Sequence, residues 1–316
     1  MAEQARDCII VGGGPAGLTA AIYLARYHLR ILVIEDGRSR AATIPLTRNH
    51  AGFPDGISGV DLLGRMRAQA ELYGVAFRHG CASALVKDTD GFSVALDGER
   101  ISARTILLAT GVVNRRPAMN MALHDEAVAN GQIRYCPVCD AYEITDKSVA
   151  VIGTGDQGVE EAVFLRSYTD DVTLVSPNAD HRLTADHVER LNRFGIRILT
   201  GPVERFELGK NFITVSHAEG RSTFASIYPA LGSDIRSELT TDLDLGRTAA
   251  GCLKVDSHQR TDIHGLYAAG DVVLGLDQMS HAMGQAAVAA TAIRNDLSET
   301  TALLRRRAVG RPSGPR

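Results

Sequence analysis

One short pattern occurs twice in this chain and limits its fold more than any other feature: an apolar strand, a glycine turn, a helix and a second strand. The first copy begins CIIVGGGPAG and the second SVAVIGTGDQG. Both have the spacing G-x-G-x-x-G, which allows a tight turn, a close approach to a pyrophosphate and close packing of helix on strand. The sequence therefore predicts an α/β chain with two nucleotide-binding units. The glycines are Gly12, Gly14 and Gly17 in the first copy and Gly153, Gly155 and Gly158 in the second.

The first unit also has an acidic residue where a dinucleotide site needs one. A helix-like segment, LTAAIYLARYHL, follows the first glycine turn, and the next apolar run, RILVIED, carries Glu35 near its end. A carboxylate at this place can accept hydrogen bonds from both hydroxyls of a ribose. We therefore interpret this unit as Rossmann-like and expect it to bind a dinucleotide.

Two cysteines, Cys136 and Cys139, lie just before the second glycine turn in the segment RYCPVCDAYE. This spacing is compatible with half of a zinc site, a structural disulfide or a redox pair. A structural zinc site needs two further ligands, and the sequence contains no second C-x-x-C. The other three cysteines are scattered and do not form the framework of a secreted, disulfide-rich protein.

Composition excludes several classes of protein. The chain has 316 residues, of which 45% are hydrophobic and 22% charged, as is ordinary for a soluble globular protein. A net charge of -3 argues against binding to nucleic acid or to a membrane surface. No apolar run is long enough to span a bilayer. The first strand begins so early that we expect no signal peptide and a cytoplasmic location.

Four motifs follow one another along the chain: GGGPAG, ILLATG, CPVCD and AAGD. Their order resembles the low-molecular-weight thioredoxin reductases over nearly the whole chain. The resemblance implies two Rossmann-like, three-layer ββα domains, with a smaller pyridine-nucleotide domain inserted in an FAD domain. The implied parts are an FAD domain at 1–115 and 245–300, an inserted domain with the cysteines at 116–244, and a basic mobile tail at 301–316.

The resemblance also assigns roles to single residues. Cys139 would accept electrons from the flavin, and Cys136 would attack the substrate disulfide. Asp140 would carry a proton to or from the leaving thiolate; a helix-capping carboxylate is the alternative. In addition to the first glycine turn, the FAD residues would be Glu35, Asn49, Ala82, Thr110, Gly111, Gly270, Asp271, Met279 and Ser280.

The second nucleotide site departs from the family pattern. NADPH-dependent members have H-R-R-x-x-x-R after the second strand of the inserted domain, and its arginines bind the 2′-phosphate. Here the stretch reads LVSPNADHRL, in which only Arg182 matches the last arginine. An acidic residue for the ribose of NADH is also missing. We therefore expect NAD(P)H to be a poor donor, and the turn GTGDQG could accept a second FAD instead.

Two further stretches beside the implied flavin differ from the family. RAATIP stands in place of G-G-Q, and QMS, residues 278–280, stands in place of R-Q-A. We predict a flavin-dependent disulfide oxidoreductase, a homodimer by resemblance, acting on a thioredoxin-like protein or a small disulfide or dithiol. One alternative is an NADPH-independent enzyme linked to ferredoxin, a second flavin or oxygen, the last as a dithiol oxidase. The other is a flavin-binding redox sensor without turnover.

Overall fold

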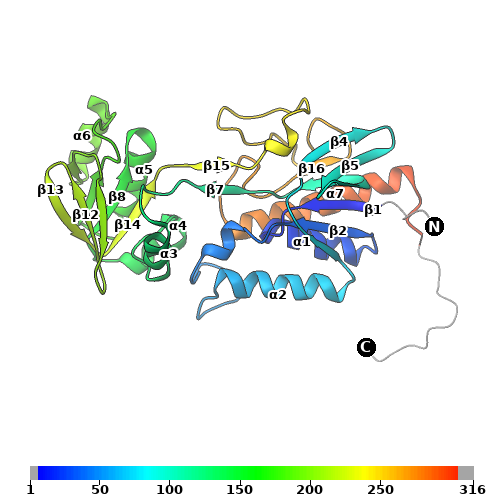
Figure 1. Ribbon diagram of the computed structural model, residues 1–316, viewed down its shortest axis with the longest axis horizontal. Coiled ribbons are helices and arrows are strands. Elements are labelled where there is room, and N and C mark those ends of the chain that lie inside the picture. Colours follow the sequence, from blue (N-terminus) through cyan, green and yellow to red (C-terminus); the bar gives the residue numbers. More distant parts are fainter. Residues whose placement is uncertain (1–5, 305–316) are drawn as a thin grey trace.

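The computed structural model describes residues 6–304 of the chain. Figure 1 shows two lobes at opposite ends of the molecule, joined by the extended strands β7 and β15. The larger lobe is built from the beginning and the end of the described chain, and the smaller lobe from its middle. The predicted α/β class, with a second nucleotide-binding domain inserted in the first, is therefore confirmed.

A seven-stranded sheet forms the centre of the larger lobe, in the order β3-β2-β1-β6-β5-β4, with β16 also paired to β6. The first three strands and β16 run parallel to β6, whereas β4 and β5 form an antiparallel extension. The strands are β1 (Arg6–Val11), β2 (Ile31–Glu35), β3 (Ala76–His79), β4 (Ala84–Asp88), β5 (Gly91–Leu96), β6 (Glu99–Leu108) and β16 (Leu266–Ala268).

Helices α1 and α7 cover one face of this sheet, and small residues allow them to approach closely. Buried alanines from both helices share one core with Cys8, Ile10 and Val33 of the strands. Helix α2 packs against α1 and is capped by Ser58, whose hydroxyl accepts a hydrogen bond from the amide of Asp61. The helices are α1 (Pro15–Arg26), the 3-10 helix η1 (Arg40–Thr43), α2 (Gly59–Leu72) and α7 (Met279–Thr300).

The smaller lobe has three layers. A parallel sheet, in the order β10-β9-β8-β14, packs α5 and α6 on one face and the antiparallel sheet β11-β12-β13 on the other. Its strands are β8 (Val149–Gly153), β9 (Val172–Val175), β10 (Arg197–Leu199), β11 (Arg205–Leu208), β12 (Ile213–His217), β13 (Gly220–Phe224) and β14 (Ser226–Ala230). Its helices are α3 (Met121–Ala129), α4 (Pro137–Asp140), the 3-10 helix η2 (Ala141–Ile144), α5 (Gly155–Leu165) and α6 (Ala185–Arg193).

The connection between the lobes is a two-stranded antiparallel ladder of β7 (Val112–Asn114) and β15 (Ser233–Ile235). The chain therefore enters and leaves the smaller lobe at neighbouring positions. An ion pair of 2.7 Å between Arg115 and Asp234 adds to the ladder at the smaller-lobe end.

Two features bear on the predicted domain limits. The 3-10 helix η3 (Glu238–Thr240) follows β15, and Leu239 and Leu243 pack on the core of the larger lobe. We therefore propose that the second part of the larger domain starts near residue 235, earlier than the predicted 245.

Most of the predicted tail, residues 305–316, lies outside the described residues. Within 6–304 there is no helix of sufficient length and apolarity to cross a membrane.

Candidate functional site

A cavity of about 690 Å³ is lined by residues of both lobes. It is large enough for a cofactor or a small-molecule substrate. Ser280 is exposed and Gly17 packs behind the glycine turn, so neither lines the cavity. Predicted site residues that line it are Gly12, Gly14, Glu35, Asn49, Ala82, Thr110, Gly111, Cys136, Cys139, Asp140, Gly270, Asp271 and Met279.

The first glycine turn has no room for side chains at two positions. A Cβ atom on Gly12, which has a φ of 118°, would lie 2.2 Å from the carbonyl oxygen of Ala109. A Cβ atom on Gly17 would lie 1.9 Å from the carbonyl oxygen of Gly12. Only glycine fits at either position. The close packing leaves the N-terminus of α1 facing the cavity, where its free N–H groups can bind a phosphate.

Glu35 lies directly against this turn. An added Cβ on Gly13 would be 2.7 Å from its Oε2, and Arg67 of α2 donates a hydrogen bond to its Oε1 at 2.5 Å. The arginine fixes the carboxylate at the end of β2, beside the cavity. A fixed carboxylate next to a phosphate-binding turn fits the ribose of a dinucleotide.

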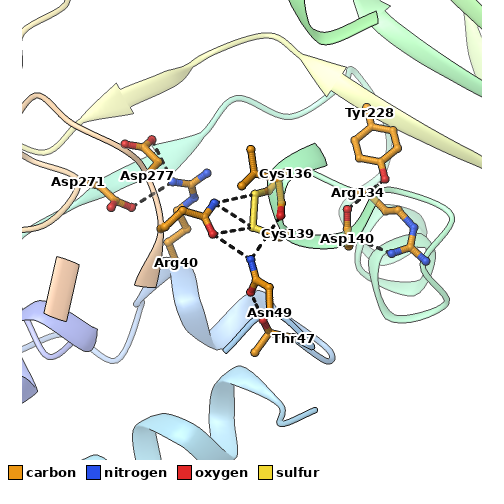
Figure 2. Close-up of a disulfide and its surroundings, with 12 residues drawn as sticks. Arg40, Thr47, Asn49, Arg134, Cys136, Cys139, Asp140, Tyr228, Asp271 and Asp277 are labelled. Carbon is orange, nitrogen blue, oxygen red and sulfur yellow. Dashed lines mark hydrogen bonds and ion pairs between the residues drawn. A yellow bond between two sulfur atoms is a disulfide. The ribbon is translucent and has the colours of Figure 1, made fainter. Parts of the chain in front are cut away.

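Arg40 of η1 is a site residue that the sequence analysis did not propose. Its Nη1 lies 3.0 Å from Oδ2 of Asp271 and 3.1 Å from Oδ2 of Asp277 (Figure 2). Burial and the charge of Asp277 raise the pKa of Asp271, and Arg40 opposes this rise. The unusual RAATIP stretch was a visible signal, but its partners lie more than 200 positions away in the chain.

Cys136 and Cys139 are joined in a disulfide, with their Cα atoms 5.2 Å apart. Cys136 is the N-cap of the short helix α4, and its carbonyl accepts a hydrogen bond from the amide of Cys139 at 2.9 Å. Pro137 takes the first helical position, where an N–H group is not needed. The covalent pair supports a disulfide over half of a zinc site.

Polar side chains of the larger lobe hold this disulfide. The Nε2 of Gln278 lies 3.1 Å from Sγ of Cys136 and 3.2 Å from Sγ of Cys139. Asn49 donates from Nδ2 to Oε1 of Gln278 at 3.1 Å and accepts at Oδ1 from the hydroxyl of Thr47 at 2.8 Å. Figure 2 shows Thr47, Asn49 and the disulfide in one line of contacts. The sequence analysis noticed the QMS stretch but assigned no role to Gln278.

Asp140 follows the disulfide on the side of the smaller lobe (Figure 2). Arg134 donates to its Oδ2 at 3.0 Å, and the hydroxyl of Tyr228 donates to its Oδ1 at 3.0 Å. Burial raises the pKa of Asp140, although both hydrogen bonds lower it. Asp140 is the N-cap residue of η2, but its side chain makes no capping hydrogen bond. The capping role considered as the alternative is therefore absent at this helix.

Glu161 of α5 is a second buried acid near this centre, and it was missed by sequence reasoning. Burial raises its pKa to about 7, and the charge of Asp140 adds to this rise. No residue of 6–304 forms a hydrogen bond with its buried Oε1. The VEEA segment in which it lies gave no signal that one of its two glutamates faces inward.

The sequence of residues 6–286 matches the family model of the pyridine nucleotide-disulphide oxidoreductases. The chain belongs to this family. It is an FAD-dependent disulfide oxidoreductase of the thioredoxin reductase type, and the vicinal disulfide fits that chemistry.

Curated relatives and solved structures agree with this assignment. A thioredoxin reductase of Mycolicibacterium smegmatis is 31% identical over 285 residues, which cover 86% of this chain and 89% of the relative. One of Streptomyces clavuligerus is 32% identical over 302 residues, covering 86% and 87%. The crystal structure of thioredoxin reductase from Streptococcus pyogenes MGAS5005 superposes with a TM-score of 0.86 at 26% identity and covers 93% of this chain and 99% of its own.

The second glycine turn of this family member keeps its packing role. Cβ atoms added to Gly153 and Gly158 would lie 2.8 Å and 2.9 Å from atoms of the surrounding strands and turn. Both glycines therefore let β8, β14 and α5 approach closely. Gly155, the glycine expected to face a pyrophosphate, has a φ of 59° and lies at the N-terminus of α5.

The chain itself covers this second turn. The hydroxyl of Thr154 donates to the carbonyl oxygen of His181 at 2.5 Å, and a Cβ on Gly155 would be 4.0 Å from the carbonyl oxygen of Arg182. These carbonyl oxygens present partial negative charge where a pyrophosphate needs hydrogen-bond donors. Burial lowers the pKa of His181, which disfavours a positive charge on its ring.

Helix α6 continues this cover. His187 pairs with Asp156 at 2.9 Å, and Arg190 pairs with Glu160, so α6 is tied to the first turns of α5. The buried hydroxyl of Ser176 donates to the carbonyl of Asp180 and closes the loop between β9 and α6. The segment between β9 and α6 therefore lies beside the N-terminus of α5, where the predicted second dinucleotide would bind.

Proposed function

We propose that this enzyme moves electrons between FAD and a protein or small-molecule disulfide through Cys136 and Cys139, without using NAD(P)H efficiently. The observation that carries the proposal is the shared cavity. The first glycine turn, Glu35 and the disulfide all line it, although they belong to different lobes. A dinucleotide held at the glycine turn can extend along this cavity toward the sulfur atoms.

The residues of the larger lobe fit FAD. The glycine turn and Glu35 would bind the pyrophosphate and the adenosine ribose, and Thr110, Gly111, Gly270 and Asp271 would bind the rest of the chain between the rings. Asn49, Ala82 and Met279 would complete the site. Bound FAD supplies two-electron redox chemistry beside the disulfide.

The cysteines would carry the electrons by thiol–disulfide exchange. In the reducing direction, the thiolate of Cys136 attacks a substrate disulfide, one substrate sulfur leaves as a thiolate, and a mixed disulfide forms. Cys139 then attacks Sγ of Cys136, which releases the second substrate sulfur and re-forms the disulfide. Asp140 would hold the proton that the leaving thiolate takes up.

The covered second turn supports the proposal on the electron donor. An NADPH site would need both the free N-terminus of α5 and cations for the 2′-phosphate. Each lost charge-assisted hydrogen bond is worth about 1.5–3 kcal/mol, so losing two weakens binding by roughly 10²- to 10⁴-fold. Of the family's H-R-R-x-x-x-R motif, this chain keeps only the last arginine, Arg182, and that residue is exposed.

This observation favours an NADPH-independent enzyme. The donor would then be ferredoxin or another reduced partner, or the reaction would run from a dithiol through the flavin to oxygen. The same cover argues against a second FAD, so we propose one flavin per chain. The substrate would be a thioredoxin-like protein or a small disulfide or dithiol, and a homodimer is the expected assembly.

Anaerobic reduction tests the donor. The enzyme is mixed with NADPH, NADH or dithiothreitol, and the flavin absorbance is followed with time. We expect dithiothreitol to bleach the flavin through the cysteines and micromolar NADPH or NADH to leave it almost unchanged. Rapid bleaching by NADPH would overturn the donor proposal. Flavin that none of the three reduces would point to a redox sensor without turnover.

A further inference from the structure

We propose that Gln278 is a catalytic residue whose side-chain amide stabilises the thiolate formed when the Cys136–Cys139 disulfide opens. The inference rests on the proposed function, because it assigns a role within that redox step. It starts from one contact: Nε2 of Gln278 lies 3.1 Å and 3.2 Å from the two sulfur atoms. The amide is thus within reach of whichever sulfur carries the charge.

The orientation of this amide is fixed by its neighbours. Asn49 donates to Oε1 of Gln278, which fixes the amide so that its NH₂ group lies nearer the sulfurs than its oxygen does. Oε1 lies 3.6 Å from Sγ of Cys139. The hydroxyl of Thr47 in turn orients Asn49. Thr47 is buried, and its backbone exchanges two hydrogen bonds with Ile57, which anchors the series in the larger lobe.

The N–H group of Gln278 would act in the step that opens the disulfide. In the reducing direction bound FAD would supply two electrons to the disulfide. The Sγ–Sγ bond would then break, one sulfur would take a proton from Asp140, the proposed acid, and the other would stay a thiolate. A neutral disulfide gains little from an N–H group, whereas a thiolate accepts a charge-assisted hydrogen bond. The amide therefore stabilises the product of the step more than its start.

The position of Gln278 separates this role from that of the acid. Asp140 lies on the smaller lobe and would exchange protons, whereas Gln278 is the N-cap residue of α7 on the larger lobe and has no proton to give. The amide from the larger lobe would stabilise negative charge on a sulfur, and the acid from the smaller lobe would exchange a proton with it. Moving the lobes apart would remove the amide from the thiolate and leave the acid behind.

The test uses the full-length protein with a single remaining thiol of the pair, in the Cys136→Ser background. The rate of alkylation of Cys139 by iodoacetamide is measured against pH, by mass spectrometry of the peptide. Three chains are compared in that background: unchanged Gln278, Gln278→Leu and Gln278→Glu. Gln69→Glu, at an exposed position on α2, is the matched control for the charge change.

We expect the pH of half-maximal alkylation rate to rise by about one unit in Gln278→Leu, since a hydrogen bond to a charged group is worth about 1.5 kcal/mol or more. The rise should be larger in Gln278→Glu, which places a carboxylate beside the thiolate, and absent in Gln69→Glu. In the two-cysteine enzyme, the equilibrium constant for reduction by dithiothreitol should fall about 10-fold in Gln278→Leu.

Two results would overturn the proposal in different ways. If Gln278 only held the loop in place, its loss would expose Cys139 and speed alkylation at every pH, with an unchanged midpoint. That result would refute the role of Gln278 and leave the proposed function unaffected. A wild-type disulfide that dithiothreitol does not reduce would overturn the proposed function and this inference together.

Discussion

At the scale of single residues, the site is a disulfide with a different polar group on each side. Asp140, Arg134 and Tyr228 belong to the smaller lobe, and Gln278 and Asn49 to the larger one. Gln278 places an N–H donor within reach of both sulfurs, and Asp140, the proposed proton carrier, directly follows Cys139 in the chain. The following three predictions concern the cysteines, Asp140 and Glu161.

The first prediction concerns Cys136 and Cys139. Cys136→Ser and Cys139→Ser should each abolish turnover of disulfide substrates, because neither remaining thiol can re-form the intramolecular bond. Both variants should keep their flavin, which the glycine turn and Glu35 hold. We expect Cys136→Ser to show a long-wavelength charge-transfer band, because its remaining thiolate would face the flavin. A band in Cys139→Ser instead would reverse the two roles, and normal turnover in both would refute the redox assignment.

For Asp140, the substitution Asp140→Asn removes the proton but keeps the shape. Because burial raises the pKa of Asp140, the acid stays protonated to a higher pH than an exposed carboxyl, and its contribution should decline as pH rises through that pKa. We expect turnover to fall by about 10²- to 10⁴-fold and this limb of the pH profile to disappear. A variant with normal turnover and lower thermal stability would instead support a purely structural carboxylate.

For Glu161, the prediction concerns stability. Its pKa is about 7 in the folded protein and 4.5 in the reference state, so the folded state loses up to about 3 kcal/mol from this group as pH rises from 4.5 through 7. Glu161→Gln should therefore raise the melting temperature at pH 8 and change it little at pH 4.5. The neighbouring Glu160→Gln is the control, because its pKa is lowered and its ion pair is exposed.

A Glu160→Gln variant should show no gain at pH 8. Equal gains in the two variants would mean that general repulsion between charges, and not burial of Glu161, sets the effect. No gain in Glu161→Gln at pH 8 would show that this carboxyl is solvated or paired in solution.

At the scale of elements, the decisive feature is the segment between β9 and α6. The sequence predicted the first strand, glycine turn, helix and second strand of each unit, because their spacing and periodicity are local properties. It also showed that the arginines for a 2′-phosphate are missing. It could not show that this segment folds back over Thr154 and Gly155, because that contact joins a side chain to a backbone carbonyl 27 positions away.

The same reason explains which site residues were found. Cys136, Cys139 and Asp140 lie in one short motif, and the glycines have a fixed spacing. Arg40 and Gln278 have no such motif, and their partners come from distant parts of the chain. Ser280 was placed near the flavin by its neighbours in sequence, but in the first turn of α7 it faces solvent.

Because the segment between β9 and α6 covers the second glycine turn, we expect that restoring the missing arginines will not restore the use of NADPH. Restoring cations by Pro177→Arg with Asn178→Arg should not make NADPH an efficient donor, because the carbonyls of His181 and Arg182 still lie at the turn. The measurement is anaerobic flavin reduction by NADPH in the double variant and in wild type. Reduction at wild-type rates is expected. A gain of 100-fold or more, on the order of what two arginine contacts provide, would mean that the cover opens readily.

At the scale of the whole molecule, the larger lobe is expected to fold and bind flavin without the smaller one. Asn114 and Ser233 are directly paired, so replacing residues 115–232 by Asn-Gly would close β7 and β15 as a two-residue hairpin. The shortened chain should keep a flavin-to-protein ratio near that of wild type and lose all disulfide turnover. Circular dichroism and the flavin spectrum check this, and an unfolded or flavin-free product would contradict it.

The ladder of β7 and β15 also has a meaning for how such a chain can arise. A gene for the larger lobe alone would need a single insertion at one hairpin to gain a whole second domain, since the inserted segment begins and ends at adjacent points of the ladder. Such an insertion changes no strand pairing in the seven-stranded sheet. The cysteine-bearing lobe could therefore be exchanged or altered while the fold of the larger lobe stays the same.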